Sequence, residues 1–309
     1  MVAVSVCMIT YGHEKFIGQA IESVLMQQTN FAIELLIAND HSLDNTDQQI
    51  RHYIATHPKG HLIKYILREK NWQMMPNFIN ALQQCSGKYI ALCEGDDYWT
   101  DPNKLQRQYD YIEQHPDIAL VAHNFHILTQ QQQIVLANTH PPHQEILQIS
   151  PQDFALRPFF QTASFFFRKT PTIEQLPKWY ANVLAGDYFL VLFLAQHGNI
   201  AYMTTPMSVY RKNPQSVSHT TKFLTVKDNF VQHLKLFNQT NANAPLRTAL
   251  QTNILLWELK AKPYETDTYA QKIIFFMRHF ACYFRHFYAI GHFKLAIKYL
   301  FSPWFAKAQ

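Results

Sequence analysis

The chain alternates short apolar runs with segments of helical character, and this alternation limits its fold more than any other feature. Apolar runs typical of buried strands lie at residues 2–10, 31–40, 61–67, 88–94 and 118–125. Segments with helical periodicity or helix-boundary residues lie between them, at residues 14–28, 42–58, 76–87 and 102–116. Strands separated by short helices predict a parallel sheet that is covered on both faces.

Carboxylates gather where several of these strands are predicted to end. The segment ALCEGDDYWTDPNKLQ (91–106) holds four of them within eight positions, namely Glu94, Asp96, Asp97 and Asp101. Further acids occur in NDHSLDNT (39–46) and at the start of GDYFLVLFLAQHG (186–198). Since ligands of open parallel sheets bind at the carboxyl ends of the strands, we expect a binding site at this edge.

The adjacent pair Asp96 and Asp97 indicates a cation. The two charges repel each other, and a hard divalent cation or a cationic ligand would compensate them. The alternative is that these acids cap the next helix. Asp101 fits that alternative, because Asp101 followed by Pro102 is typical of an N-cap and a first helical position. Asp96 and Asp97 lie too early to cap that helix, but spacing alone leaves both interpretations of the pair open.

Composition predicts one main domain with an appendage. The chain has 309 residues and is 48% hydrophobic, which is enough to bury a large core. Residues 220–309 hold 12 Lys and Arg against 4 Asp and Glu, whereas residues 1–219 hold 15 against 18. The net charges of +8 and −3 sum to the +5 of the whole chain, so the basic character is C-terminal.

Cysteine usage and hydropathy predict a cytoplasmic protein. The four cysteines form no CxxC or Cys/His metal spacing, and most lie in or beside apolar segments: Cys7, Cys85, Cys93 and Cys282. The N-terminus has no cationic start before its apolar run and carries Glu14 early, unlike a secretory signal. The longest uncharged stretch, residues 188–210, is broken by polar residues, glycine and proline, so we expect no membrane-spanning helix.

Four segments together resemble the family 2 glycosyltransferases, which are inverting enzymes of the GT-A fold. They are VSVCMITYGHEKFIGQAIESVLMQQTN, IELLIANDHSLDNT, REKNWQMMPNFINALQQCSGKYIALCEGDDYWTDPNKLQRQ and AGDYFLVLFL. The likeness is especially close to bacterial members that build surface polysaccharides or lipopolysaccharide. It covers about residues 1–219 and implies an α/β catalytic domain with a Rossmann-like, mostly parallel sheet. Residues 220–309 are then expected to form a helical C-terminal extension.

By position, the resemblance implies a nucleotide-sugar donor, most often a UDP-sugar. Tyr11 would lie against the base and Asp40 would accept a hydrogen bond from uracil, in agreement with the stacking of aromatic rings and the acceptor character of carboxylates. The alternatives are an ordinary strand-end aromatic residue and an Asx turn. The resemblance assigns further residues to the donor site: Thr10, Glu14, Arg68, Asn71, Asp96 and Arg211.

The resemblance also implies a metal ion and a catalytic base. Asp97, Asp96 and His219 would hold Mn²⁺ or Mg²⁺, which neutralises charge on the departing diphosphate. Asp187 would take the proton from the acceptor hydroxyl, on the face opposite the leaving group. The alternative for Asp187 is an N-cap of the helix that follows it.

Three positions depart from the family pattern. Asn39 replaces the first Asp of a DDGS-like turn, His41 replaces its Gly, and Gly186 stands where many members have an acid. The QxxRW motif of processive members does not occur, so we expect one sugar per encounter. Sugar choice would depend on loops such as FQTASFFF (160–167) and NWQMM (71–75), which the sequence does not orient.

The basic tail has two interpretations. Residues 268–305 contain no acid, and Gln271, Arg278, Arg285 and His292 recur every seven residues among aromatics. Such a helix suits the headgroup region of an anionic membrane, near a lipid-linked acceptor, and would place the enzyme peripherally on the inner membrane face. Alternatively it packs on the catalytic domain.

Rival functions are a sugar-phosphate nucleotidyltransferase, a nucleic-acid binder and a catalytically silent nucleotide-sugar-binding relative. The first should have a Gly-rich N-terminal loop, but TYGHEK has only Gly12. The second lacks any recognisable motif, and residues 1–219 are net acidic, so we expect no nucleic acid as a partner. The silent relative stays open.

Overall fold

The computed structural model describes residues 2–138, 144–156, 160–212 and 221–261. The chain divides into two compact units. One contains Met1–Phe154 and Pro158–His219, and the other contains Ala155–Arg157 and Thr220–Gln309.

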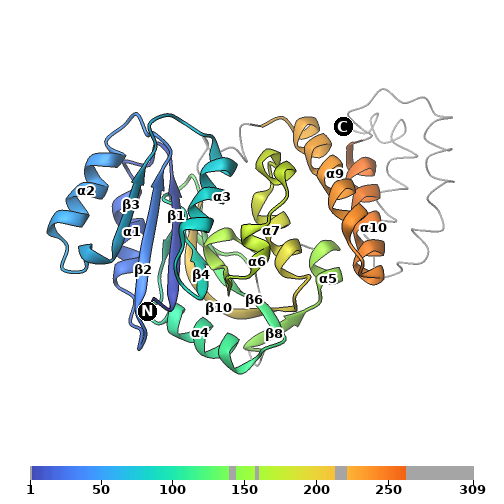
Figure 1. The fold of residues 1–309 in the computed structure, drawn as a ribbon, viewed down its shortest axis with the longest axis horizontal. Helices are drawn as coiled ribbons and strands as arrows, with labels where there is room; N and C mark the ends of the chain where they lie inside the picture. The colour runs from blue at the N-terminus through green and yellow to red at the C-terminus, as the bar shows by residue number, and fades with distance from the viewer. Residues whose placement is uncertain (1, 139–143, 157–159, 213–220, 262–309) are drawn as a thin grey trace. The chain divides into compact units, whose positions relative to one another are not determined.

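The first unit is built on one large sheet with helices packed against it (Figure 1). The strands are β1 (Val4–Thr10), β2 (Ile33–Asn39), β3 (Ile63–Leu67), β4 (Tyr89–Leu92), β5 (Tyr98–Trp99), β6 (Ile118–Leu128), β7 (Ile134–Leu136), β8 (Ile146–Ile149), β9 (Phe166–Arg168) and β10 (Asn199–Arg211). The α-helices are α1 (Ile17–Leu25), α2 (Thr46–Thr56), α3 (Met74–Gln84), α4 (Lys104–Gln114), α5 (Pro151–Leu156), which reaches into the second unit, α6 (Pro171–Glu174) and α7 (Gly186–Leu194). The described residues of this unit also form the 3₁₀ turns η1 (Gly60–Leu62), η2 (Thr162–Ser164) and η3 (Lys178–Asn182).

The first four strands are parallel, in the order β3-β2-β1-β4, as the alternation of strands and helices predicts. The rest of the sheet is mixed, which agrees with the mostly parallel sheet that the resemblance implies. β9 inserts antiparallel between β4 and β6, while β6 and β10 are parallel to each other and β5 is antiparallel to β10. β9 is only three residues long, which is too short for a periodic pattern to predict a strand from the sequence.

One predicted helix start was wrong. The Asp101–Pro102 pair predicts a helix beginning at Pro102, but α4 begins at Lys104 with Asn103 in the N-cap position. Asp101 still accepts a local hydrogen bond, from the backbone N–H of Asn103 at 2.8 Å, and it pairs with Arg107 at 3.0 Å. The Asp-Pro pair therefore forms the turn before the helix rather than its first residues.

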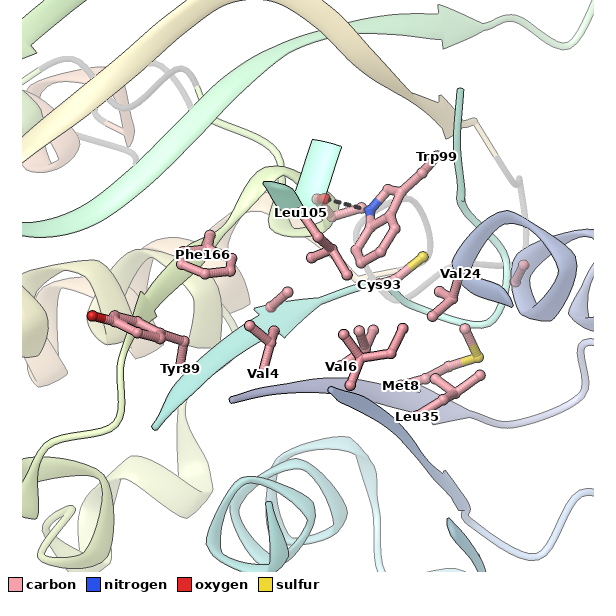
Figure 2. Packing of buried hydrophobic residues seen from close by; sticks show 14 of the residues in the cluster. Val4, Val6, Met8, Val24, Leu35, Tyr89, Cys93, Trp99, Leu105 and Phe166 are labelled. Atoms are coloured by element: carbon pink, nitrogen blue, oxygen red, sulfur yellow. Dashed lines mark hydrogen bonds between the residues drawn. The ribbon is translucent and has the colours of Figure 1, made fainter. Parts of the chain in front are cut away.

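The core lies on both faces of β1. Consecutive side chains of a strand point to opposite faces, and residues 4–8 are all buried. Val4, Val6 and Met8 form one face together with Val24 of α1 and Leu35 of β2 (Figure 2). Each such buried side chain contributes about 1.5–3 kcal/mol through removal of apolar surface from water. The opposite face is covered by α3, which packs on β1 and β2. Burial on both faces is what gives β1 its unbroken apolar sequence.

The second unit contains two described helices, α9 (Phe223–Thr240) and α10 (Ala244–Ala261). They pack through aromatic rings, with the Phe230 and Trp257 ring centroids 4.9 Å apart, and through a Lys235–Glu258 ion pair at 3.2 Å. Of the described helices, none combines the length and the apolar character needed to cross a bilayer. The aromatic and cationic stripe predicted for residues 268–305 lies outside the described residues.

Candidate functional site

The carboxyl ends of β1, β2 and β4 meet at one edge of the sheet. The register pairs Thr10 with Asn39 between β1 and β2. Backbone pairing continues past the strands, since Asp40 N–H donates to the Thr10 carbonyl at 2.9 Å and Gly95 N–H donates to the Ile9 carbonyl at 3.0 Å. The loops after these strands are therefore neighbours, as the parallel topology predicts.

Asp97 is a buried carboxylate of this edge, with 3% of its surface exposed, as is Asp40. Its Oδ1 accepts a hydrogen bond from the backbone N–H of Arg211 at 2.9 Å, and its Oδ2 accepts one from Nε2 of Gln161. Burial raises the pKa of Asp97 well above its ordinary value, and the charges of Asp96 and Glu94 raise it further, against the opposing effect of the Arg211 hydrogen bond. A bound cation would stabilise such a carboxylate.

Glu94 and Asp187 lie close together in the structure although they are far apart in the sequence. Burial raises the pKa of Glu94 to about 8, with further contributions from the charges of Asp96 and Asp187. Burial also raises the pKa of Asp187. The Thr162 hydroxyl interacts with both carboxyl groups and favours their ionised forms, and Tyr188 N–H donates to Asp187 Oδ1 at 2.8 Å. The start of α7 thus brings Asp187 to the acidic loop that follows β4.

Asp96 lies beside His13, with Oδ2 and Nε2 3.8 Å apart. The other ring nitrogen of His13 lies 3.1 Å from Oγ1 of Thr10. A Cβ at Gly95 would come within 2.6 Å of the same Thr10 oxygen. Glycine at position 95 therefore lets the acidic loop pack directly against the end of β1.

The acidic loop would fit a divalent cation only if a substrate supplied part of the coordination. The described ranges contain no group of three or more His, Cys, Asp and Glu side chains that could hold a metal ion. Mg²⁺, however, usually binds through one or two carboxylates together with substrate phosphates rather than in an all-protein cage. Asp97, enclosed and beside two other carboxylates, offers one such ligand. His219, the third predicted ligand, lies outside the described residues.

Three residues predicted to contact the nucleotide lie on adjacent loops of this edge. Tyr11 is 47% exposed, so its ring is accessible to a base. Asp40 is buried, and its Oδ1 accepts a hydrogen bond from Trp72 N–H at 2.7 Å. The Arg68 guanidinium lies 4.2 Å from the centroid of the Trp72 ring, and burial lowers the pKa of Arg68 against the opposing charge of Asp40. The contacts through Trp72 link Asp40 to Arg68.

The two departures in the loop after β2 have structural reasons. Asn39 Nδ2 donates to Tyr65 Oη at 3.0 Å, and the Tyr65 hydroxyl donates to Asp47 at 2.6 Å. An ionised Asp at position 39 could not donate this hydrogen bond. His41 has φ 62°, the left-handed conformation that glycine adopts without strain, and its ring nitrogen lies 3.2 Å from the Arg68 carbonyl. The loop therefore keeps a glycine-like backbone without a glycine.

Glu14 and Asn71, both predicted donor ligands, make hydrogen bonds within the loops of the site. Glu14 Oε2 accepts hydrogen bonds from the backbone and side chain of Asn45 at 3.0 and 3.1 Å. Asn71 Oδ1 accepts one from Gln73 N–H at 2.8 Å. These bonds shape the loops, and direct contact of Glu14 and Asn71 with a donor stays a prediction.

Arg211, at the end of β10, is held by two aromatic rings. Its guanidinium lies 4.7 Å from the Tyr98 ring centroid and 5.1 Å from that of Phe16, and one terminal nitrogen donates to Gln19. Its Nε is buried and has no hydrogen-bond partner among the described residues. The positively charged Arg211 lies beside the acidic loop, because its backbone N–H donates a hydrogen bond to Asp97.

The third departure, Gly186, has a packing reason. A Cβ at this position would overlap the sulfur and terminal methyl group of Met75 in α3. α7 begins at Gly186 with Ala185 in the N-cap position, so Asp187 lies in the first turn and the N-cap interpretation of Asp187 was wrong.

Two residues of the site, Gln161 and Thr162, were not predicted from the sequence. They belong to the segment FQTASFFF, whose orientation the sequence does not give. In the structure Gln161 donates to Asp97, and Thr162 interacts with both Glu94 and Asp187. The only sequence signal for these two residues was a polar pair shortly before the aromatic run of residues 165–167.

Comparisons with known proteins show the family of the chain. Residues 5–176 match the family described as glycosyl transferase family 2. An uncharacterized protein of Mycobacterium tuberculosis is 34% identical over 215 residues, which is 70% of this chain and 60% of the relative. The O-antigen biosynthesis glycosyltransferase WbnJ of Escherichia coli is 24% identical over 172 residues, 56% of this chain and 64% of WbnJ. The chain thus spans about 60% of the length of its mycobacterial relatives.

Solved structures show the same fold at low sequence identity. TarS of S. aureus in complex with UDP-GlcNAc has a TM-score of 0.63 at 13% identity, covering 85% of this chain and 74% of the TarS chain. The mannosyltransferase PcManGT of Pyrobaculum calidifontis, in complex with GDP-Man and Mn²⁺, has a TM-score of 0.58 at 17% identity, covering 97% and 87%. The expected GT-A fold is confirmed. Because the family match covers more than half of the chain and includes the acidic loop, this protein belongs to glycosyl transferase family 2.

Proposed function

We propose that the protein is an inverting, metal-dependent, non-processive glycosyltransferase that uses a nucleotide-sugar donor, most simply a UDP-sugar. The observation that carries the proposal is that Glu94 lies close to two carboxylates from segments far apart in the sequence, Asp97 and Asp187, so that both lie at the loop after β4. Asp97 would bind the metal ion of the donor diphosphate, and Asp187 would take the proton of the acceptor hydroxyl. Two structural neighbours are described as complexes with UDP-GlcNAc and with GDP-Man and Mn²⁺, which supports the donor class.

The donor would lie along the edge formed by the β1, β2 and β4 loops. Tyr11 would stack on the base, and Asp40 would accept a hydrogen bond from it. Arg211 would donate charge-assisted hydrogen bonds to the diphosphate. When bound, Mn²⁺ or Mg²⁺ at Asp97, with Asp96 nearby, supplies Lewis-acid neutralisation of the leaving diphosphate.

Asp187 would act as the general base. The acceptor oxygen forms a bond to the anomeric carbon while the bond from that carbon to the diphosphate oxygen breaks, and the diphosphate leaves with the electron pair. The hydroxyl proton passes to the Asp187 carboxylate. Burial raises the pKa of Asp187, which strengthens it as a base, while the Tyr188 N–H holds one oxygen in place. Direct attack from the opposite face inverts the anomeric centre.

We further infer that the acceptor is a hydroxyl of a glycan or a lipid-linked saccharide in bacterial surface polysaccharide synthesis, on the inner face of the cytoplasmic membrane. The likeness to the O-antigen enzyme WbnJ supports this role, and the basic, aromatic sequence of residues 268–309 supports peripheral membrane contact. Sedimentation with anionic vesicles, with and without residues 268–309, tests that contact; equal pelleting of both forms rejects it.

The donor class is tested first by thermal shift with UDP-, GDP- and dTDP-sugars, with Mn²⁺ or with EDTA. We expect one nucleotide to stabilise the protein only when Mn²⁺ is present, and Asp97→Asn to abolish the stabilisation. Asp110→Asn, on the exposed face of α4, is the matched control and should behave as wild type.

The reaction is tested with Asp187→Asn. Loss of a general base lowers the rate of transfer or donor hydrolysis by about 10²–10⁴-fold, while donor binding should be retained. NMR of the product from an α-linked donor should show a β linkage. If wild type and Asp187→Asn turn over the donor equally, the assigned base is wrong; if neither turns it over although both bind it, the protein is a silent relative.

A further inference from the structure

Gln161 has an unusual hydrogen-bonding state for a buried glutamine. It is 7% exposed, and its Nε2 donates to Oδ2 of Asp97. Its Oε1 is buried and has no hydrogen-bond partner among the described residues. A buried polar atom without a partner lowers the stability of the protein, so a residue kept in this state is expected to serve a purpose other than stability.

The backbone that carries Gln161 is firmly anchored. Its carbonyl accepts hydrogen bonds from the backbone N–H and the hydroxyl of Ser164, at 2.9 and 2.6 Å. The turn η2 that follows is held by two buried donors, Trp99 Nε1 on the Ala163 carbonyl at 2.8 Å and Gln108 Nε2 on the Ser164 carbonyl at 2.9 Å. The position of the carboxamide is therefore set by β5 and α4, independently of Asp97.

Asp97 receives two fixed donors, one on each oxygen. Oδ1 is bound by the Arg211 backbone N–H and Oδ2 by Gln161. Each carboxylate oxygen can accept more than one hydrogen bond or ligand, so both remain able to bind a cation. Glu94 and Asp96 lie close by and repel Asp97. Without Gln161, only one oxygen would be held against this repulsion.

We propose that Gln161 is a positioning residue that fixes the Asp97 carboxylate for a divalent cation, and that its free Oε1 accepts a hydrogen bond from a donor group that arrives with that cation. The inference rests on the proposed function, since it assumes that the cation binds at Asp97. Partners that orient a metal ligand in this way typically change metal affinity by about 10–100-fold when they are removed.

The test is Mn²⁺ binding by the full chain, followed through the EPR signal of free Mn²⁺ in the presence of UDP, or of GDP or dTDP if one of those stabilises the wild type. Gln161→Met keeps the length of the side chain but removes the donor. We expect the half-saturating Mn²⁺ concentration to rise about 10-fold or more, while nucleotide binding in EDTA changes less than about twofold. Gln131→Met, in an exposed turn, is the matched control and should bind Mn²⁺ as wild type does.

Loss of the cooperative thermal transition identifies a variant that does not fold. Gln161→Asn then replaces Gln161→Met, because the shorter side chain of asparagine cannot reach Asp97. Wild-type Mn²⁺ affinity in a folded variant overturns the positioning role and leaves the proposed function intact. If the wild type binds Mn²⁺ with none of the three nucleotides, both proposals are wrong.

Discussion

The backbone N–H of Arg211 donates to Asp97 Oδ1 at 2.9 Å and so ties the end of β10 to the acidic loop after β4. The bond belongs to the main chain, whereas the Arg211 guanidinium points to Tyr98, Phe16 and Gln19. Arg211 therefore has two separable roles: its backbone holds Asp97, and its side chain supplies positive charge to the site.

Replacing Arg211 with Ala should weaken donor binding without loosening Asp97. A hydrogen bond to a charged group contributes about 1.5–3 kcal/mol, so the donor KM should rise about 10–100-fold. The half-saturating Mn²⁺ concentration, measured separately, should change much less, because the backbone N–H remains. Arg51→Ala, which removes an exposed arginine paired with Asp47, should leave donor KM unchanged. A donor KM at the wild-type level in Arg211→Ala would exclude the phosphate contact.

Glu94→Gln should make the metal-free protein more stable at pH 7.5 than the wild type. The pKa of Glu94 is raised to about 8 in the folded protein, so the folded state binds more protons than the unfolded state between its ordinary pKa of 4.5 and pH 8. Wild-type stability therefore falls as pH rises through this window, by at most about 1.4 kcal/mol per pH unit for this group. Urea unfolding in EDTA at pH 5.5, 6.5 and 7.5 measures the difference between the two proteins. Glu69→Gln, at an exposed position, should show the wild-type slope, and an equal slope for Glu94→Gln contradicts the prediction.

Lys104→Met should change the pH dependence of stability in the opposite direction. Lys104 is fully buried, its Nζ donates to Gln108 at 2.7 Å and lies 3.9 Å from the Trp99 ring centroid, and burial lowers its pKa to about 7. Above pH 7 the unfolded chain holds a proton that the folded chain has lost, so this group adds stability as pH rises, by at most about 1.4 kcal/mol per pH unit.

The free energy of unfolding of the wild type should accordingly rise relative to that of Lys104→Met between pH 7 and pH 8.5. Lys70→Met, which removes an exposed lysine, is the control and should follow the wild type at every pH. A constant difference between wild type and Lys104→Met would show that Lys104 stays charged in the folded protein.

Gly186→Ala should destabilise the protein because of Met75 alone. The overlapping atoms are the flexible end of the Met75 side chain, but Met75 is only 5% exposed, so it has little room to move. Overpacking costs up to about 1–3 kcal/mol, whereas alanine is favoured over glycine within a helix by about 0.5–1 kcal/mol. In a Met75→Ala background the overlap with the sulfur disappears, so Gly186→Ala should become neutral or stabilising. Thermal unfolding of the four proteins of this double-mutant cycle measures the reversal; the same cost in both backgrounds would contradict it.

The sequence by itself determined the part of the fold that local pattern encodes. The alternation of apolar runs and amphipathic segments predicted β1 to β4 and the helices between them, because strand and helix periodicities are local properties of the chain. Since parallel strands place their carboxyl ends at one edge, the sequence also placed the acidic loop of Asp96 and Asp97 beside Tyr11 and Asp40.

Only the tertiary structure decided which distant groups reach that loop. Gln161 and Thr162 precede β9, whose antiparallel insertion between β4 and β6 is a long-range pairing without a periodic signature. The raised pKa values of Glu94 and Asp187 likewise depend on burial and on charges brought in from other segments. Hydrogen-bond partners and burial are properties of packing, so residue types and their spacing could indicate an acidic site but could not show what holds its carboxylates in place.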